Sequence, residues 1–310
     1  MRTKISLFII TALFISSNLL AQDVAVAKKD TSYWKKKTQF GANFSNAAFA
    51  GNWSAGGQNI IGLNFFFNAK GEYAKDKATW VNDLQLQYGT QNVDSKGYRK
   101  SIDRIFFDTK AGHKLSKVWS LVGGLNFQSQ FLGGYRYDDK NPNGRLISSI
   151  FAPAFITEYV GFEWRPKPHF NIVFAPGALR QTIVANDDIR LDDDNKPQKV
   201  FGVDVGKTVQ NDVGIIQIVA SYDRDVATNV NLKLRYQLFM DANKIAHMDN
   251  RVDAKLAAKI NKYFSATFDL IALYDDDQTI PGSKGTDGKP LQNYNIQLAT
   301  NIGLGFLYTF

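Results

Sequence analysis

The chain lacks cysteine entirely and has only three histidines in 310 residues. Without a thiol it forms no disulfide and offers no thiolate to a metal. The histidines, His113, His169 and His247, lie far apart in the sequence, so they give none of the short spacings typical of a zinc site. Phosphate-binding loops and haem-attachment motifs are missing as well. We therefore expect neither a metal nor a cofactor.

Long hydrophobic runs are missing after the first 21 residues. No later segment approaches the ~20 apolar residues that a membrane-crossing helix needs. The one apolar run, residues 5–20, follows Arg2 and Lys4 and precedes Ala21. That layout predicts a cleaved signal peptide at 1–21; polar side chains inside the run disfavour the alternative, a membrane-anchoring helix. The polar, basic residues 22–37 are predicted to form a mobile periplasmic leader before a single domain at 38–310.

A strong charge of one sign is also absent. The whole chain carries 37 basic and 29 acidic residues, a net charge of +8. Removing the signal peptide takes away two of the basic residues. The remaining excess is modest, and it does not indicate a nucleic-acid partner.

The dominant positive signal is the alternation of apolar and polar residues with a period of two. A helix would scatter such a set around its circumference, whereas a strand places it on one face. The pattern recurs at 80–88, 119–131, 230–240 and 264–274. It is clearest at the end of the chain, where one face collects these residues: Tyr294, Ile296, Leu298, Ile302, Leu304, Phe306, Tyr308 and Phe310.

The lengths of these segments and of their connections indicate the architecture. Many segments have about ten or more residues, whereas a usual globular strand has about five or six. A membrane-crossing strand needs that length. Tight turns (74–77, 116–118, 165–168, 224–226 and 261–263) alternate with longer connections (51–57, 92–101, 136–147, 185–208, 242–249 and 276–290). We predict an all-β fold, a transmembrane antiparallel up-and-down barrel of about twelve strands. The strand lengths disfavour a β-sandwich.

Register and closure can be predicted at the C-terminal end. A turn at 261–263 places Ala258 opposite Ala266 and Leu256 opposite Phe268 on the outer face, and Lys255 opposite Asp269 inside. The last strand is expected to pair with the first, near 38–50, because a barrel in lipid leaves no free edge. Its aromatic end resembles the signal that hands outer-membrane barrels to their assembly machinery, and the residues of that signal would be Phe306, Tyr308 and Phe310.

The polar face is the candidate functional surface. By alternation, seven charged residues face the lumen: Lys233, Arg235, Arg251, Asp253, Lys255, Lys259 and Asp269. Five positive and two negative charges predict a mild preference for anions. Alternatively, these charges pair with one another and block the lumen. A barrel of about twelve strands lies between filled eight-stranded and open sixteen-stranded barrels, so we expect a narrow or plugged lumen.

The sequence gives little support for calcium binding or for catalysis. The acidic stretches 187–194 and 275–277 lack the glycine and glutamate spacing of a calcium-binding loop, and we interpret them as solvated surface. No G-x-S-x-G motif occurs, and His113 is expected to face Leu121 rather than a serine. Catalysis by this chain is therefore disfavoured, although a lipid-modifying enzyme stays as an alternative.

Three segments resemble a known family: "NWSAGGQN" (52–59), "YRKSIDR" (98–104) and "KLSKVWSLVGGLNFQSQFLGGY" (114–135). They are similar to an uncharacterised Bacteroidota outer-membrane β-barrel family, domain-of-unknown-function family three-zero-seven-eight. The matching positions are Asn52, Trp53, Gly56, Gly57, Lys100, Asp103, Trp119, Asn126, Gln130, Phe131, Gly134 and Tyr135. The resemblance implies an outer-membrane location and no established activity.

These observations lead to a functional hypothesis. We predict an outer-membrane barrel that acts as a narrow pore or a scaffold without catalysis. A lipid-modifying enzyme and a structural or adaptor subunit of an envelope complex are the alternatives. The expected partners are outer-membrane lipid and lipopolysaccharide, the barrel-assembly machinery and an envelope protein, with no nucleic acid.

Overall fold

The strands of this chain close into a barrel. The computed structural model describes residues 32–47, 59–93, 96–137, 141–192, 195–242, 248–274, 279–284, 290–292 and 296–309. In this part of the chain twelve strands form one closed ring in the order β1-β16-β13-β12-β11-β10-β9-β8-β5-β4-β3-β2. Every neighbouring pair in the ring is antiparallel. No helix in these ranges is long and apolar enough to span a membrane.

The twelve barrel strands are long, as predicted. Their bounds are β1 (Trp34–Ala47), β2 (Ile60–Lys75), β3 (Ala78–Val93), β4 (Tyr98–Lys114), β5 (Trp119–Ser129), β8 (Ala154–Lys167), β9 (Phe170–Ile183), β10 (Val209–Ala227), β11 (Val230–Asp241), β12 (Met248–Lys259), β13 (Phe264–Tyr274) and β16 (Gln297–Thr309). They have 11 to 19 residues each, enough to cross a bilayer when tilted. The predicted fold class is confirmed.

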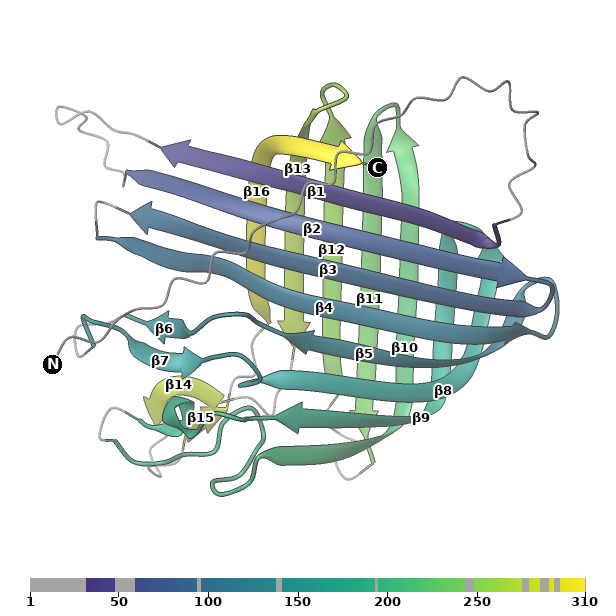
Figure 1. Ribbon diagram of the computed structural model, residues 1–310. Coiled ribbons are helices and arrows are strands. Elements are labelled where there is room, and N and C mark those ends of the chain that lie inside the picture. The colour runs from purple at the N-terminus through teal and green to yellow at the C-terminus, as the bar shows by residue number, and fades with distance from the viewer. Residues whose placement is uncertain are drawn as a thin grey trace, which may run out of the picture. The chain divides into compact units, whose positions relative to one another are not determined.

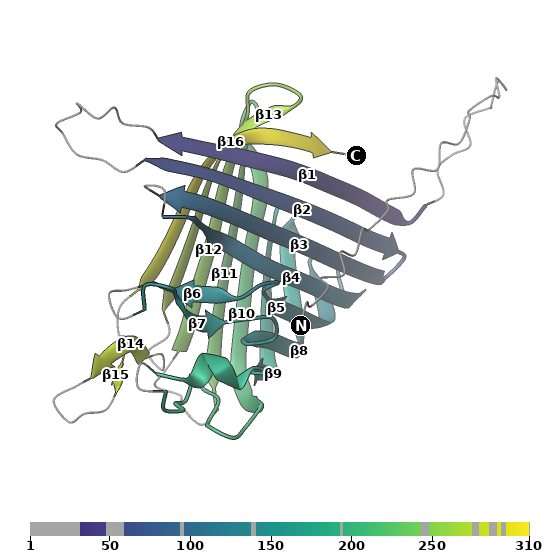
Figure 2. The same cartoon turned by 60° about the vertical axis from the view of Figure 1, so that its left-hand side comes forward.

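Further short elements gather at one end of the barrel, away from the tight turns (Figure 2). They are the hairpin of β6 (Gly134–Arg136) and β7 (Arg145–Ser148), the 3₁₀ helix η1 (Asp187–Arg190), and the hairpin of β14 (Thr279–Lys284) and β15 (Pro290–Gln292). We call this end the loop end and the opposite one the turn end.

The predicted register and closure are confirmed. Ala258 pairs with Ala266, Leu256 with Phe268 and Lys255 with Asp269. β1 pairs with β16 from Gln39↔Thr309 to Phe44↔Leu304. Of the expected terminal signal, Phe306 and Tyr308 lie on the exposed outer face, while Phe310 lies outside the described residues.

Two of the boundaries that differ from the prediction share one cause. β1 begins at Trp34, before the end of the leader predicted at 22–37, and of the preceding part of that leader only residues 32 and 33 are described. The turn predicted at 224–226 lies instead between Ala227 and Val230. The reason is the same in both places. Apolar alternation marks only the part of a strand that faces hydrocarbon, and the pairing continues beyond it through charged residues.

The outer surface of the barrel is apolar. Large side chains such as Phe65, Ile302 and Leu304 are 42–76% exposed, which suits a surface that faces lipid. Near the turn end, aromatic rings meet across strands: Trp34 and Trp80 lie 5.8 Å apart, and Trp119 and Trp164 lie 6.5 Å apart. Such rings form interfacial belts in membrane proteins. The chain is a transmembrane β-barrel.

β8 and β9 approach each other so closely at Gly161 that only a glycine fits there. A substitution at this position therefore tests the packing of the two strands. A Cβ at Gly161 would collide with the carbonyl oxygen of Phe174 and lie 2.6 Å from the Cα of Ala175. We expect Gly161→Val to lower the free energy of unfolding in lipid by about 1–3 kcal/mol, because backbone cannot move aside as a side chain can. Urea titration in bilayers measures this change.

Gly177 provides the matched control. A Cβ built there meets nothing within 4 Å, so Gly177→Val should unfold like the wild type. Equal stability of the two variants would contradict the close packing of β8 on β9.

Candidate functional site

The barrel interior is unevenly filled. Inward-facing side chains of β5 and β8–β11 form a packed apolar cluster: Val122, Tyr159, Val173, Ala175, Ala178, Val219 and Phe239. Glycines on neighbouring strands make room for its rings, since a Cβ at Gly124 would strike the Tyr159 hydroxyphenyl group and one at Gly214 would lie 2.5 Å from the Phe239 ring. This half of the lumen is closed by packing.

The other half holds a cavity of about 800 Å³. Its lining comes mainly from β1–β4, β10–β13 and β16. Pro168 and His169 line it at the turn end, and Gln91 and Ser101 line it at the loop end. The cavity therefore extends along the barrel between the two ends.

Charged side chains dominate the cavity wall. Among the described residues, eight basic and six acidic groups line it: Lys37, Lys70, Arg104, Lys110, Arg165, Lys233, Arg235 and Lys255, with Glu72, Asp83, Asp108, Asp223, Asp253 and Asp269. The excess of two positive charges is smaller than the predicted excess of three, because Arg251 and Lys259 do not line the cavity and the other walls add nearly equal numbers of basic and acidic groups.

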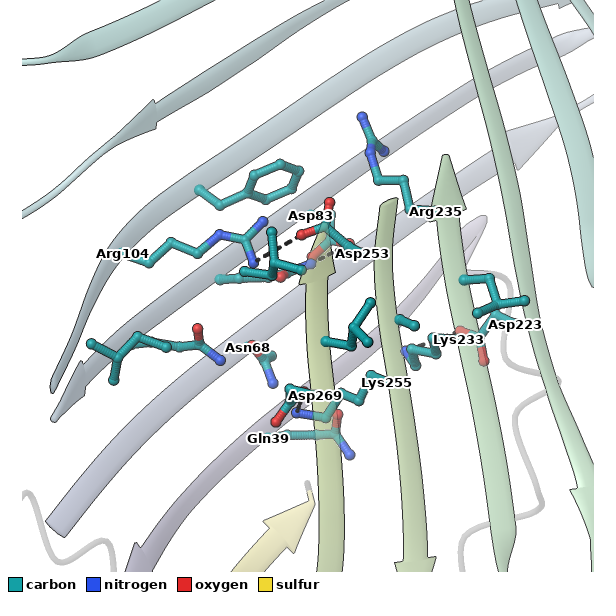
Figure 3. Close-up of a pocket in the computed structure, with 18 of the residues that line it drawn as sticks. Gln39, Asn68, Asp83, Arg104, Asp223, Lys233, Arg235, Asp253, Lys255 and Asp269 are labelled. Atoms are coloured by element: carbon teal, nitrogen blue, oxygen red, sulfur yellow. Dashed lines mark hydrogen bonds and ion pairs between the residues drawn. The ribbon is translucent and has the colours of Figure 1, made fainter. Parts of the chain in front are cut away.

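Ion pairs cross the lumen near its middle. Arg235 on β11 lies 3.5 Å from Asp108 on β4, and Arg104 on β4 lies 4.0 Å from Asp253 on β12. β4 stands five and six places from β11 and β12 in the twelve-strand ring, so these pairs join nearly opposite walls. Figure 3 shows Arg104 and Asp253 directed toward each other inside the barrel. We call these two pairs the crossing pairs.

Each carboxylate of the crossing pairs has a second partner. The guanidinium of Arg251 donates two hydrogen bonds to Asp253, at 2.8 and 2.9 Å. The amide of Asn126 donates to Asp108 at 3.1 Å. Because both acids are held on their own walls, an arginine can leave without stranding an unpaired carboxylate.

Both crossing arginines contact one aromatic ring. The Phe106 ring points inward from β4 and is buried. The guanidinium of Arg104 lies 4.7 Å from its centroid, and that of Arg235 lies 5.6 Å from it. Cation–π contact holds both arginines beside one ring, so the crossing pairs and the Phe106 ring lie at one level of the lumen.

Toward the turn end the charges pair along the wall. Glu163 on β8 accepts from Lys110 at 2.7 Å and from Arg165 at 2.8 Å. Lys233 on β11 pairs with Asp223 on β10 at 2.9 Å. These pairs join adjacent or nearby strands and leave the centre of the cavity free.

The structure places the seven predicted lumen charges as follows. Lys233, Arg235, Asp253, Lys255 and Asp269 line the cavity, and Lys255 and Asp269 form an ion pair of 3.1 Å. Arg251 lies behind Asp253, to which it donates. Lys259 is the exposed last residue of β12 and does not line the cavity.

Sequence reasoning missed the opposite wall. Arg104, Asp108 and Lys110 are separated by even numbers of positions in β4, so they share one face of the strand. The same alternation was used to assign the lumen face of 230–240, and it could have assigned these residues too. The partners of Arg104 and Asp108 across the lumen could not have been inferred, because they lie on strands that are distant in the ring.

Apart from Trp119 at the turn end and Asn126 beside Asp108, the family positions either lie outside the described residues or gather at the start of β4. Asn52, Trp53, Gly56 and Gly57 lie outside the described residues. Lys100 and Asp103, at the start of β4, form an ion pair of 3.0 Å whose acid is almost completely buried. Gln130, Gly134 and Tyr135 lie beside this pair around a second, smaller pocket.

The loop end carries a small folded cap with its own apolar cluster of Ala152, Val184, Ile189 and Val203. Arg190, buried beside this cluster, donates to the carbonyls of Val203 at 2.8 Å and Lys207 at 2.6 Å. The acidic stretch at 187–194 is thus partly structural, although the Asp187 side chain itself is largely exposed. The described residues hold no cluster of three or more acidic or histidine side chains arranged for a metal.

One carboxylate of the cap is perturbed by its neighbours. Asp204 accepts hydrogen bonds from the ammonium groups of Lys199 and Lys207, at 3.0 and 3.1 Å. These two bonds hold the pKa of Asp204 below its usual value.

Two of the three histidines lie within the described residues, and each has a different neighbour. His113 faces Leu121 across β4 and β5, as predicted. His169 lies at the turn end, where its ring meets that of Tyr222 edge to face at 5.6 Å. His247 lies outside the described residues.

The chain was compared with known protein families, curated proteins and solved structures. A family model described as protein of unknown function (DUF3078) matches residues 44–135, where the resemblance was predicted. No curated protein matches the chain.

Solved structures of similar architecture are outer-membrane barrels. The NanC porin is 10% identical over 87% of this chain and 98% of its own, with a TM-score of 0.36. An outer membrane channel from Pseudomonas putida F1 is 8% identical over 89% and 94%, with a TM-score of 0.38. An anion-selective porin from Comamonas acidovorans is 10% identical over 89% and 99%, with a TM-score of 0.32. Likeness at this level does not transfer a solute or a mechanism.

Proposed function

We propose that the protein forms a narrow, charge-lined passage for small polar solutes across the outer membrane, after export by its signal peptide. The observation that carries this proposal is the cavity of about 800 Å³, whose lining extends from the turn end to the loop end. A filled scaffold would pack both halves of the lumen. Here only the side of β5 and β8–β11 is packed.

The crossing pairs set the expected behaviour of the passage. They join opposite walls at its middle, and a solute must displace or pass between these side chains. We therefore expect small conductance rather than the large steps of an open sixteen-stranded porin. The excess of basic groups in the lining favours anions only slightly.

The direct test is conductance of the refolded protein in planar bilayers, with Lys255→Glu as the variant. Lys255 lines the cavity, so reversing its charge should move the reversal potential in a salt gradient toward cations. The wild type should show small discrete steps with weak anion preference.

Lys117→Glu is the matched control. This lysine lies in the β4–β5 turn and does not line the cavity, so its reversal should leave selectivity almost unchanged. Silence at all voltages, from protein that shows heat-modifiable migration on a gel, would contradict the proposed passage.

A further inference from the structure

A second pocket, of about 250 Å³, lies at the loop end, where the start of β4 meets the end of β5 and the β6–β7 hairpin. Ser101 and Ile102 line both this pocket and the main cavity. The pocket therefore adjoins the mouth of the lumen. We call it the rim pocket.

The wall of the rim pocket is held rigidly by Asp103. Its carboxylate accepts hydrogen bonds from the backbone N–H groups of Phe131 at 2.8 Å and Leu132 at 2.9 Å, and from the Lys100 ammonium at 3.0 Å. Lys100 also donates to the Leu132 carbonyl at 2.8 Å. Charge-assisted bonds of this kind fix the segment after β5 against β4.

Two features of the backbone shape the rim pocket. The pairing of β3 with β4 shifts between Gly89↔Ile102 and Thr90↔Lys100, which leaves Ser101 as the extra residue of a bulge. Bulges re-aim side chains and occur beside functional sites. On the other wall, a Cβ at Gly134 would collide with the Ser148 hydroxyl, so a side chain at that position would intrude into the pocket.

The pocket contains hydrogen-bond donors that no protein group uses. The Nε2 atom of Gln130 is buried and has no partner among the described residues. The Lys100 ammonium has three N–H groups and uses two of them within the protein. A buried unused donor costs free energy, and a ligand with acceptor oxygens would satisfy both groups.

Aromatic rings complete the lining. Tyr135 is half exposed, and its ring lies 6.4 Å from that of Tyr137. The guanidinium of Arg99 lies 3.8 Å from the Tyr137 centroid and holds that ring in place. Flat, amphipathic faces of this kind suit a ligand with one apolar face and polar edges.

We propose that the rim pocket binds one ring of a neutral, polyhydroxylated ligand, that is, a sugar. Among the residues that line the pocket, the charge of Lys100 is compensated by Asp103, and the nearby guanidinium of Arg99 is directed at the Tyr137 ring, which favours a neutral ligand over an ion. Its volume lies below the ~300 Å³ of pockets for drug-sized ligands, which limits the occupant to about one ring. Binding here does not require the lumen to conduct.

The test is binding of defined sugars to the detergent-solubilised full chain, followed by saturation-transfer NMR and titration. Glucose and N-acetylglucosamine are the neutral probes, and glucuronate and glucosamine are the charged counterparts. The neutral probes should bind more tightly. Gln130→Ala should raise their Kd about tenfold, because it removes the unused amide donor.

Gln128→Ala is the matched control. Gln128 lies two residues earlier on β5, its amide donates to Asn126 at 2.9 Å, and it does not line the rim pocket. Its Kd should equal that of the wild type. Tyr135→Leu, at a half-exposed position that folding should tolerate, should weaken binding by removing the stacking face.

Three results would overturn the proposal: no saturation transfer from either neutral sugar, tighter binding of the charged counterparts, or wild-type affinity in both Gln130→Ala and Tyr135→Leu. Because these are binding measurements, they are independent of conductance. A silent bilayer with intact sugar binding would reject the passage and keep the rim pocket.

Discussion

Replacing both Arg104 and Arg235 with alanine is expected to raise the single-channel conductance several-fold. These arginines reach across the lumen to Asp253 and Asp108, and both lie beside the Phe106 ring. Their removal opens the level at which opposite walls meet. The two acids keep Arg251 and Asn126 as partners, so the barrel should remain folded.

The same double variant should also change selectivity. The lining loses two of its eight basic groups and keeps all six acidic ones, so the weak anion preference should disappear. Arg224→Ala serves as the control, because Arg224 is exposed near the turn end and does not line the cavity. Unchanged conductance in the double variant would show that the crossing pairs do not limit the passage.

Glu163→Ala is expected to produce the largest loss of stability. The Glu163 carboxylate is almost buried, and it serves both Lys110 and Arg165. Without it the ammonium of Lys110, itself only 13% exposed, has lost its ion-pair partner. Breaking a buried pair from one side costs about 3–5 kcal/mol. Urea unfolding in bilayers measures the change.

Glu72→Ala is the comparison for this experiment. Glu72 pairs with Lys70 at 2.6 Å, but both side chains are more than a third exposed, and such pairs contribute about 0–1 kcal/mol. The double variant Lys110→Met with Glu163→Leu should recover most of the lost stability, because apolar groups of similar volume can replace a buried pair. A Glu163→Ala protein as stable as Glu72→Ala would show that water reaches Lys110.

The register between β12 and β13 was predictable because two local constraints agree. The tight turn limits the pairing, and a slip of one residue would move Lys255 from the lumen into lipid. Closure of β16 on β1 followed from the need to leave no free edge in a membrane. Both arguments use only neighbouring strands and the solvent on each face.

The crossing pairs were not predictable in this way. Arg104 and Asp253 are about 150 residues apart in the chain and stand on opposite walls of the ring. Alternation shows that each faces inward, but it carries no information on which inward groups meet across the lumen. The rim pocket was not predictable for another reason. It lies where the β6–β7 hairpin packs beside the start of β4, and alternation does not show how a loop hairpin folds onto neighbouring strands.

The apolar cluster inside the barrel is another feature that the sequence pattern could not predict. Val122, Tyr159 and Val219 alternate with equally apolar outward residues such as Leu121 and Val160. Where both faces of a strand are apolar, the pattern does not distinguish the lumen from lipid. The glycines beside Tyr159 and Phe239 allow these two rings to point into the lumen, because a glycine has no side chain to occupy the space of the ring.

The sequence by itself determined the class of fold, the approximate number of strands, the register of the last hairpin and the lipid-facing surface, because each depends on alternation and turn length between adjacent segments. Tertiary structure alone decided which half of the lumen is packed, which charges cross it and where the rim pocket lies. The crossing charges stand on strands far apart in the ring, which only the closed barrel brings within reach of one another. The packed half and the rim pocket depend on how inward side chains and the β6–β7 hairpin pack against neighbouring strands, which alternation does not specify.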